Sequence, residues 1–196
     1  MIRLGVLGST NGTDLQAIID AISNKILDAK ISLVISNRKN AYILERAHKH
    51  NIPKIFISHK EKDRQSFDRE ISILFTRSKV DLVLLIGFMR ILTKDFCLTW
   101  KDKILNVHPS LLPKYAGGMD NDIHEQVLKN GDVETGCTIH FVTEELDAGP
   151  ILVQKKCQIE GKDSPETLKK KVQFLEGEAF LEAIKLFQKN YLIKNG

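Results

Sequence analysis

Two polar side chains stand at the end of an otherwise apolar segment near the middle of the chain. In the stretch ILNVHPSLLP, Asn106 and His108 are separated by one residue, and Pro109 follows the histidine directly. Proline disfavours helical geometry at the residue before it, so His108 stays extended. Because side chains two residues apart in an extended chain point the same way, we expect the amide and the imidazole to project together.

Such a pair has the groups needed for acid–base chemistry. An asparagine amide can donate a hydrogen bond to a developing oxyanion, and a histidine can give or take a proton near neutral pH. The alternative is a structural Asn–His pair that caps a loop. The choice between these readings depends on a third polar group nearby.

A downstream segment offers carboxylates for that third place. The stretch EELDAGP follows a predicted strand and contains Glu144, Glu145 and Asp147. A carboxylate beside His108 would stabilise the imidazolium and raise the pKa of the histidine. Aspartate is also common in turns for its local hydrogen bonds, which is the alternative for Asp147. The residue types alone do not choose among the three carboxylates.

A loop of small residues follows the first predicted strand. The stretch GSTNGTD covers residues 8–14 and leads into an amphipathic segment. Free backbone N–H groups at the start of a helix favour an anion, typically a phosphate. The loop matches neither GxGxxG nor the Walker pattern, so an ordinary strand-to-helix turn is the alternative. Asp14 suits the first turn of a helix but would repel a nearby phosphate.

Hydrophobic periodicity predicts alternating strands and helices. The predicted strands cover residues 2–7, 31–35, 54–57, 81–86, 103–107, 137–142 and 151–159, and the predicted helices cover 15–22, 41–50, 67–75 and 164–179. The unbroken apolar run at 81–86 is typical of a strand buried on both faces, as in a parallel sheet. We therefore predict one α/β domain over residues 1–196, an open, mostly parallel, twisted, Rossmann-like sheet with helices on both faces. Ligands of such folds bind at the carboxyl ends of strands, where the polar segments fall.

Composition excludes several classes of protein. Among 196 residues the net charge is +4, and lysines and arginines are scattered, so we expect no nucleic-acid partner. Three cysteines (Cys97, Cys137 and Cys157) lie far apart, as expected of small buried side chains in a reducing compartment. The six histidines lack zinc-ligand spacing, and residues 82–89 are too short to span a bilayer. With no signal-peptide pattern, we expect a cytoplasmic enzyme without a metal or membrane partner.

Three segments together resemble one family. NVHPSLLPKYAGG, GFMRIL and VTEELDAGPI resemble the folate-dependent formyltransferases, and the resemblance runs from about residue 2 to 185. It implies transfer of a formyl group from the co-substrate 10-formyltetrahydrofolate to the amine of glycinamide ribonucleotide, a step of purine (IMP) biosynthesis that needs no metal. The family's catalytic residues fall on Asn106, His108 and Asp147. The resemblance implies that Asn106 and an imidazolium at His108 stabilise the tetrahedral intermediate, while Asp147 keeps His108 charged and helps relay a proton.

The resemblance also implies binding residues, with the ribonucleotide in the N-terminal half and the folate and the catalytic groups in the C-terminal half. It assigns the ribonucleotide and its phosphate to Asn11, Gly12, Thr13, Asp14, Gln173 and Glu176, and the folate to Arg64, Met89, Arg90, Ile91, Leu92 and Asn106. The alternatives are core packing for Met89, Ile91 and Leu92, a solvated helix start for Arg64, and an exposed polar helix face for Gln173 and Glu176.

The chain departs from the family pattern at two places. Asp14 stands where an asparagine is usual, and residues 116–123 (AGGMDNDI) replace a shorter loop that carries a His-x-His pair. Asp122 takes the place of the first histidine and His124 that of the second. These differences bear on substrate contacts and leave the catalytic residues unchanged.

Other members and classes give alternative readings. Methionyl-tRNA formyltransferase has an additional C-terminal RNA-binding domain and formyltetrahydrofolate hydrolase an N-terminal regulatory domain, and we expect neither here. The small phosphate-type loop argues against a sugar-nucleotide amine formyltransferase. A catalytically inactive folate-binding protein would lose the histidine or the aspartate, and a generic nucleotide-binding module leaves the two catalytic segments unexplained. The family contains both monomers and homodimers.

Overall fold

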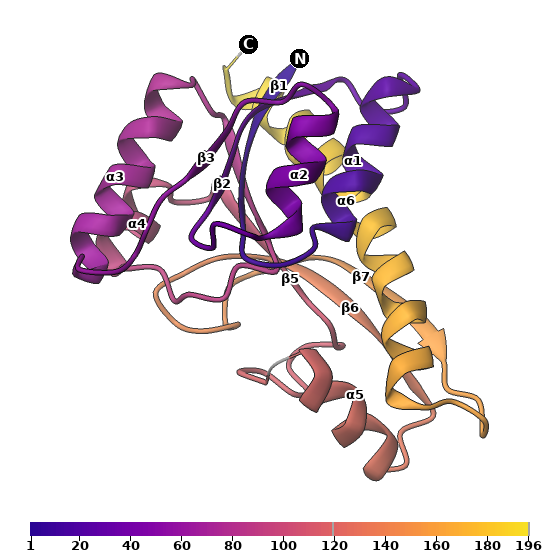
Figure 1. Ribbon diagram of the computed structural model, residues 1–196. Helices are drawn as coiled ribbons and strands as arrows, with labels where there is room; N and C mark the ends of the chain where they lie inside the picture. The colour runs from indigo at the N-terminus through magenta and orange to yellow at the C-terminus, as the bar shows by residue number, and fades with distance from the viewer. Residues whose placement is uncertain (119, 196) are drawn as a thin grey trace.

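The computed structural model describes residues 1–118 and 120–195, in which a seven-stranded sheet lies between two layers of helices (Figure 1). The strands are β1 (Ile2–Gly8), β2 (Ala29–Ser36), β3 (Lys54–Phe56), β4 (Leu82–Ile86), β5 (Ile104–His108), β6 (Glu134–Phe141) and β7 (Ile151–Gln158). The helices are α1 (Thr13–Ser23), α2 (Tyr42–Lys49), α3 (Arg64–Arg77), α4 (Lys94–Thr99), α5 (Asp120–Lys129) and α6 (Pro165–Asn195). The predicted α/β domain with an open, mostly parallel sheet is confirmed.

The sheet changes direction at one edge. Its strand order is β3-β2-β1-β4-β5-β6-β7, and β1 to β5 are paired in parallel. The pairings of β5 with β6 and of β6 with β7 are antiparallel. The β5–β6 register places Asn106 opposite His140 and His108 opposite Thr138. The carboxyl end of the last parallel strand therefore meets a strand that runs back across it.

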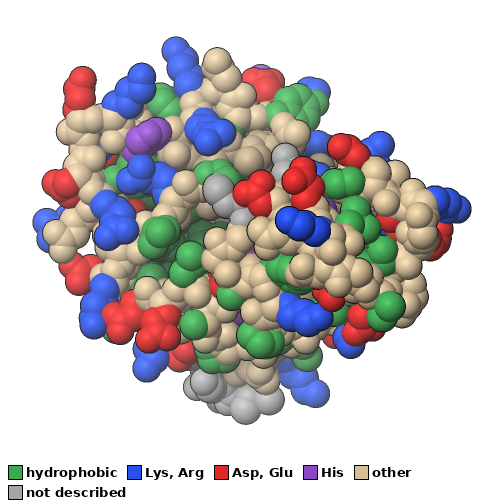
Figure 2. Space-filling model, turned by 90° about the horizontal axis from the view of Figure 1, so that it is seen from below, with side chains coloured by type: hydrophobic (Ala, Val, Ile, Leu, Met, Phe, Trp, Pro, Cys, Tyr) green, Lys and Arg blue, Asp and Glu red, His purple; other side chains and the backbone are tan. Residues whose placement is uncertain are grey.

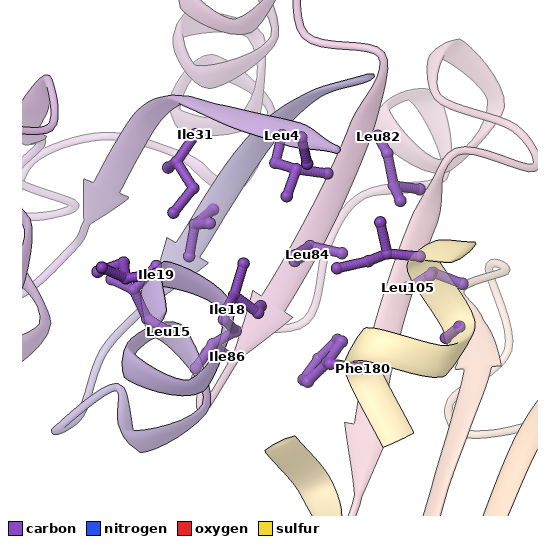
Figure 3. Packing of buried hydrophobic residues seen from close by; sticks show 14 of the residues in the cluster. Leu4, Leu15, Ile18, Ile19, Ile31, Leu82, Leu84, Ile86, Leu105 and Phe180 are labelled. Atoms are coloured by element: carbon purple, nitrogen blue, oxygen red, sulfur yellow. The ribbon is translucent and has the colours of Figure 1, made fainter. Parts of the chain in front are cut away.

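Two hydrophobic clusters hold the layers to the sheet. One joins β1, β2 and β4 to α1, α2 and α6, and the other joins the opposite face to α3 and α4. Figure 3 shows the first, with Phe180 of α6 and Ile18 of α1 directed toward Leu84 of β4. Full burial of each such side chain contributes roughly 1.5–3 kcal/mol relative to exposure, so the strand ends that carry the polar segments are firmly placed.

Two helices were not predicted from the sequence. The helix α4 has six residues, too few for a hydrophobic period to be visible. In α5 the stretch DNDIHEQVLK is mostly polar, and its few apolar side chains pack on α6: Ile123 and Val127 form a third cluster with Leu168. The segment 116–123, treated above as a loop, thus enters α5 at residue 120, and its residue 119 lies outside the described residues.

The structure shows how far each cysteine is buried and what character the helices have. All three cysteines are free thiols; Cys97 and Cys137 are buried, and Cys157 is half-buried. Within residues 1–118 and 120–195, no helix has the length and apolar character needed to cross a bilayer.

Candidate active site

A buried histidine and aspartate meet where β5 ends. His108 is the last residue of β5, and its Nδ1 lies 3.3 Å from Oδ2 of Asp147, in the turn after β6. The backbone N–H of Gly117 donates to the same carboxylate oxygen over 2.8 Å. Glu144 instead forms an ion pair with Lys94 at 2.7 Å. Among the candidates left open by residue type, the structure therefore brings Asp147 beside the histidine.

The turn that carries Asp147 has a local cause. Asp147 adopts a left-handed conformation with φ of 52°, which aspartate tolerates better than most residues. A Cβ at Gly149 would lie 1.8 Å from the carbonyl oxygen of Phe141, so only glycine fits there. The sequence DAGP thus folds back tightly onto the end of β6 and directs the carboxylate toward the sheet.

His140, which sequence reasoning missed, completes the arrangement. Its Nδ1 lies 3.0 Å from the carbonyl oxygen of Phe141, which can only accept, so Nδ1 carries a proton. In the neutral ring Nε2 is then an acceptor, and it lies 3.2 Å from Nδ2 of Asn106. Nε2 also lies 3.6 Å from Oδ1 of Asp147. His140 thereby fixes which end of the Asn106 amide faces it.

The charge state of His108 differs from the sequence-based expectation. Burial lowers the pKa of His108 below its usual value, and the nearby charge of Asp147 opposes this shift only in part. Asp147 therefore acts on this pKa in the predicted direction, but desolvation of the buried imidazolium outweighs its attraction to the carboxylate. The Nε2 atom lies 2.9 Å from the carbonyl oxygen of Tyr115, so this nitrogen carries the proton of the neutral ring.

Asp147 remains ionised near neutral pH. Burial alone would raise the pKa of its carboxyl group, but the contact with His140, the N–H of Gly117 and the charge of His108 whenever that ring is protonated lower it on balance. A buried neutral histidine thus lies beside a buried carboxylate. The pair can take up a proton at Nδ1 with the carboxylate in place to stabilise the product.

The small-residue loop after β1 has the form expected of an anion site. Gly12 precedes α1 with φ of 65°, and a Cβ there would lie 2.5 Å from Ile43. Asn11 and Thr13 on either side are exposed. The guanidinium Nε of Arg46 donates to the carbonyl oxygen of Asn11 over 2.8 Å, which holds a positive charge against the loop.

Asp14 does not face outward from this loop. It is buried, with 5% of its surface exposed, and so is Glu176 of α6 with 8%. Burial raises the pKa of the Cys137 thiol, and the charges of Glu176 and then Asp14 raise it further. Both carboxylates therefore lie near the same buried thiol under α1 and α6. The exposed-face alternative is wrong for Glu176, whereas Gln173 is half-buried.

The loop between β4 and α4 divides its side chains between solvent and core. Met89 and Ile91 are 40% and 56% exposed, whereas Leu92 is buried in the cluster under α3 and α4, as the core-packing alternative held. The guanidinium of Arg90 lies 4.7 Å from the ring centre of Phe67.

Arg64 begins α3 beside a surface hollow. Arg64 is exposed, as its solvated-start alternative also requires. The hollow has a volume of about 380 Å³ and separates the starts of α3 and α4. It is lined by Asp63, Arg64, Gln65, Thr93, Lys94 and Asp95. A second hollow of similar volume, on the outer face of α3, is lined by none of the predicted site residues.

The described part of the chain holds no candidate metal site, and one face of the molecule carries mixed charges. Among residues 1–118 and 120–195 there is no group of three or more histidine, cysteine, aspartate or glutamate side chains that could hold a metal ion. On the face seen in Figure 2, lysines and arginines are interspersed with acidic and hydrophobic side chains. This face carries no continuous stripe of one charge.

Comparisons with known proteins agree on one family. A model of the formyl transferase family matches residues 2–184. The chain belongs to the formyl transferase family. It is 40% identical over 193 residues to the phosphoribosylglycinamide formyltransferase of Haemophilus influenzae, covering 98% of this chain and 90% of the relative. The crystal structure of glycinamide ribonucleotide transformylase 1 from Symbiobacterium toebii superimposes with a TM-score of 0.92 at 36% identity, covering 97% of this chain and 89% of that one.

Longer relatives match over only part of their length. The chain is 42% identical over 196 residues to the trifunctional purine biosynthetic protein adenosine-3 of Chironomus tentans. The match covers 98% of this chain but 14% of that relative, so the formyl transferase chain spans about one seventh of the longer protein.

Proposed function

We propose that the chain transfers a formyl group from 10-formyltetrahydrofolate to the amine of 5'-phosphoribosylglycinamide. The products are formylglycinamide ribonucleotide and tetrahydrofolate, and the reaction is a step of de novo purine (IMP) synthesis. Family membership and the names of the full-length relatives support this proposal. The observation that carries it is the meeting of Asn106, His108 and Asp147 at the end of β5, where the side chains of His108 and Asp147 are almost fully buried.

The proposed reaction begins with attack of the ribonucleotide amine on the formyl carbon. A carbon–nitrogen bond forms, and the carbonyl electron pair moves to oxygen. In the structure, the Tyr115 carbonyl oxygen accepts from Nε2–H of His108 over 2.9 Å. We propose that the formyl oxygen takes this place and also accepts from the Asn106 amide. Preorganised donors of this kind stabilise an oxyanion in a buried site.

Collapse of the intermediate requires a proton transfer. The bond between the formyl carbon and the folate nitrogen breaks, and the proton lost by the amine reaches that nitrogen. The proposed carrier is the His108–Asp147 pair, with water as a further link. A neutral histidine at rest can accept the proton, and Asp147, 3.3 Å from Nδ1, stabilises the imidazolium while it exists. The imidazolium expected from the sequence is then a transient rather than the resting state.

The two substrates are proposed to occupy different halves of the chain. The ribonucleotide phosphate would lie on the backbone N–H groups of Asn11, Gly12 and Thr13, with the Arg46 charge nearby. Asp14 would contribute its backbone, because its side chain is buried. The half-buried Gln173 of α6 would contact the ribose, with the buried Glu176 of the same helix beneath it.

The folate is proposed to lie against the loop that follows β4. The pterin would contact the backbone of residues 89–92. Arg64, in the hollow between α3 and α4, would meet the acidic folate tail.

Three free cysteines fit a reducing cytoplasm, and a monomer and a homodimer are both compatible with this arrangement.

One assay tests the proposed function. Purified chain is mixed with 10-formyltetrahydrofolate, and release of tetrahydrofolate is followed with and without 5'-phosphoribosylglycinamide. Turnover that requires the ribonucleotide is the expected result. Turnover without any amine would instead indicate a hydrolase, and no turnover with the ribonucleotide would contradict the proposed acceptor. The His108→Ala chain serves as the control for a contaminating activity.

A further inference from the structure

One buried serine joins the two loops assigned to different substrates. Ser9 follows β1 in the loop assigned to the ribonucleotide phosphate, and Met89 lies in the loop assigned to the folate. We propose that Ser9 is a positioning residue whose hydroxyl fixes the folate loop against the phosphate loop. The identity of the two ligands rests on the proposed function.

The hydroxyl of Ser9 has partners from two other segments. The backbone N–H of Met89 donates to Ser9 Oγ over 3.0 Å, and Ser9 Oγ donates to Oδ1 of Asn37 over 2.6 Å. Ser9 and Asn37 are 2% and 6% exposed. Because the N–H of Met89 can only donate, the single proton of the serine must point to Asn37. The oxygen end of the Asn37 amide therefore faces Ser9, and this orientation pairs both the serine hydroxyl and the N–H of Met89.

Backbone contacts bring the two loops together at the same point. β1 and β4 pair in parallel up to Gly8 and Ile86, and the N–H of Ser9 then donates to the carbonyl oxygen of Gly87 over 3.0 Å. Gly87 has φ of 56°, and a Cβ there would lie 2.2 Å from Oγ1 of Thr10. The loops are in direct contact, with no space for a side chain at residue 87.

Loss of the Ser9 hydroxyl should act on folate binding from a distance. Without it, the N–H of Met89 is either left unpaired in a half-buried place or must move to find another partner. The folate loop then loses one of its fixed points while its own residues are unchanged. Because Ser9 is buried, the effect passes through the position of the loop rather than through a contact with the ligand.

Ser36 provides a matched control. It is also a fully buried serine, and its hydroxyl also donates one hydrogen bond and accepts one, to and from the backbone of Arg38 at 3.1 Å. Both bonds stay at the end of β2 and reach neither loop. Ser36→Ala therefore removes the same group at the same depth without breaking the link between the loops.

The test compares Ser9→Ala with Ser36→Ala by calorimetric titration with 10-formylfolate, a stable analogue of the formyl donor. We expect Ser9→Ala to weaken binding by roughly tenfold, as loss of one buried hydrogen bond implies, and Ser36→Ala to bind like wild type. In the formyl transfer assay, Ser9→Ala should raise KM for the donor and leave kcat nearly unchanged. Hydrogen exchange in peptides covering Met89 should accelerate in Ser9→Ala alone.

The outcomes separate this inference from the proposed function. Unchanged binding in Ser9→Ala, or equal losses in both serine variants, would overturn the positioning role. Wild-type chain that fails to bind 10-formylfolate would overturn the proposed function, while hydrogen exchange still reports on the link itself. If Ser9→Ala does not fold, Asn37→Ala replaces it, because it removes the acceptor of the serine proton and should weaken binding in the same direction, by a smaller factor.

Discussion

The proposed catalytic corner, formed by Asn106, His108, His140 and Asp147, differs from the two proposed substrate loops in how far it is completed before any substrate binds. In the corner, the side chains of both histidines and of the aspartate are almost fully buried and have partners within the chain. In the loops, Asn11, Thr13, Met89 and Ile91 present exposed side chains. The corner lies where the sheet turns antiparallel, whereas both loops follow parallel strands.

This difference indicates a division of labour. Groups fixed in advance stabilise a transition state without the cost of reorganisation, so changes in the corner should lower kcat. Groups on exposed loops gain their partners when the ligand arrives, so changes there should raise KM. Each prediction below tests one side of this contrast.

The largest effect is expected at His108. His108→Ala removes the donor to the proposed oxyanion and the proton acceptor together, so kcat should fall by roughly a thousandfold. The single-turnover rate of formyl transfer measures this, with circular dichroism to show that the chain is folded. A folded His108→Ala chain with near-normal turnover would remove the corner from the chemistry.

Asn106 should come next. Asn106→Ala removes one proposed oxyanion donor and leaves His108 and Asp147 in place, so we expect kcat to fall by about 10²–10³-fold. Asn106→Asp is the matched variant, since it keeps the shape but cannot donate to the oxyanion. A rise in KM for either substrate without a fall in kcat would show that Asn106 binds rather than catalyses.

A smaller effect is expected at His140, which contacts the amide rather than the substrate. His140→Leu removes the acceptor that orients Asn106, and we expect a fall in kcat of roughly tenfold. The same substitution made in the Asn106→Ala background should have little further effect on kcat. Full additivity of the two losses would contradict a positioning role through Asn106.

The corner and the loops were visible in the sequence to different degrees. The paired projection of Asn106 and His108 followed from strand geometry, and the phosphate-type loop followed from its small residues. His140 was missed because its contact with Asn106 arises from the antiparallel β5–β6 register, which no local pattern reveals. The net direction of the His108 pKa shift could not be predicted, because burial, which decides it, depends on the whole fold. The helix α5 was missed because its stretch is mostly polar.

The smallest effect is the pH dependence of stability that burial of His108 creates. The pKa of His108 in the folded chain lies below 6.5, its usual value in the unfolded chain. Between the folded and the unfolded pKa the unfolded chain binds more protons than the folded chain, so stability rises with pH. As pH falls below about 6.5, the wild type should lose stability more steeply than His108→Gln, by up to about 1.4 kcal/mol per pH unit. Urea unfolding at several pH values measures this, and equal slopes would contradict the shift. Asp147, whose folded pKa is also lowered, contributes a slope of the same sign in a lower pH window, with stability lost as pH falls below about 4.

The most direct test of the contrast between corner and loops is a pair of substitutions in one steady-state assay of formyl transfer. Asp147→Asn keeps the shape of the corner but removes its buried charge, whereas Arg64→Ala removes an exposed charge beside the proposed folate tail. Asp147→Asn should lower kcat by roughly a thousandfold with KM nearly unchanged. Arg64→Ala should raise KM for 10-formyltetrahydrofolate several-fold with kcat preserved. An Asp147→Asn chain that keeps its kcat would contradict the account of the catalytic corner.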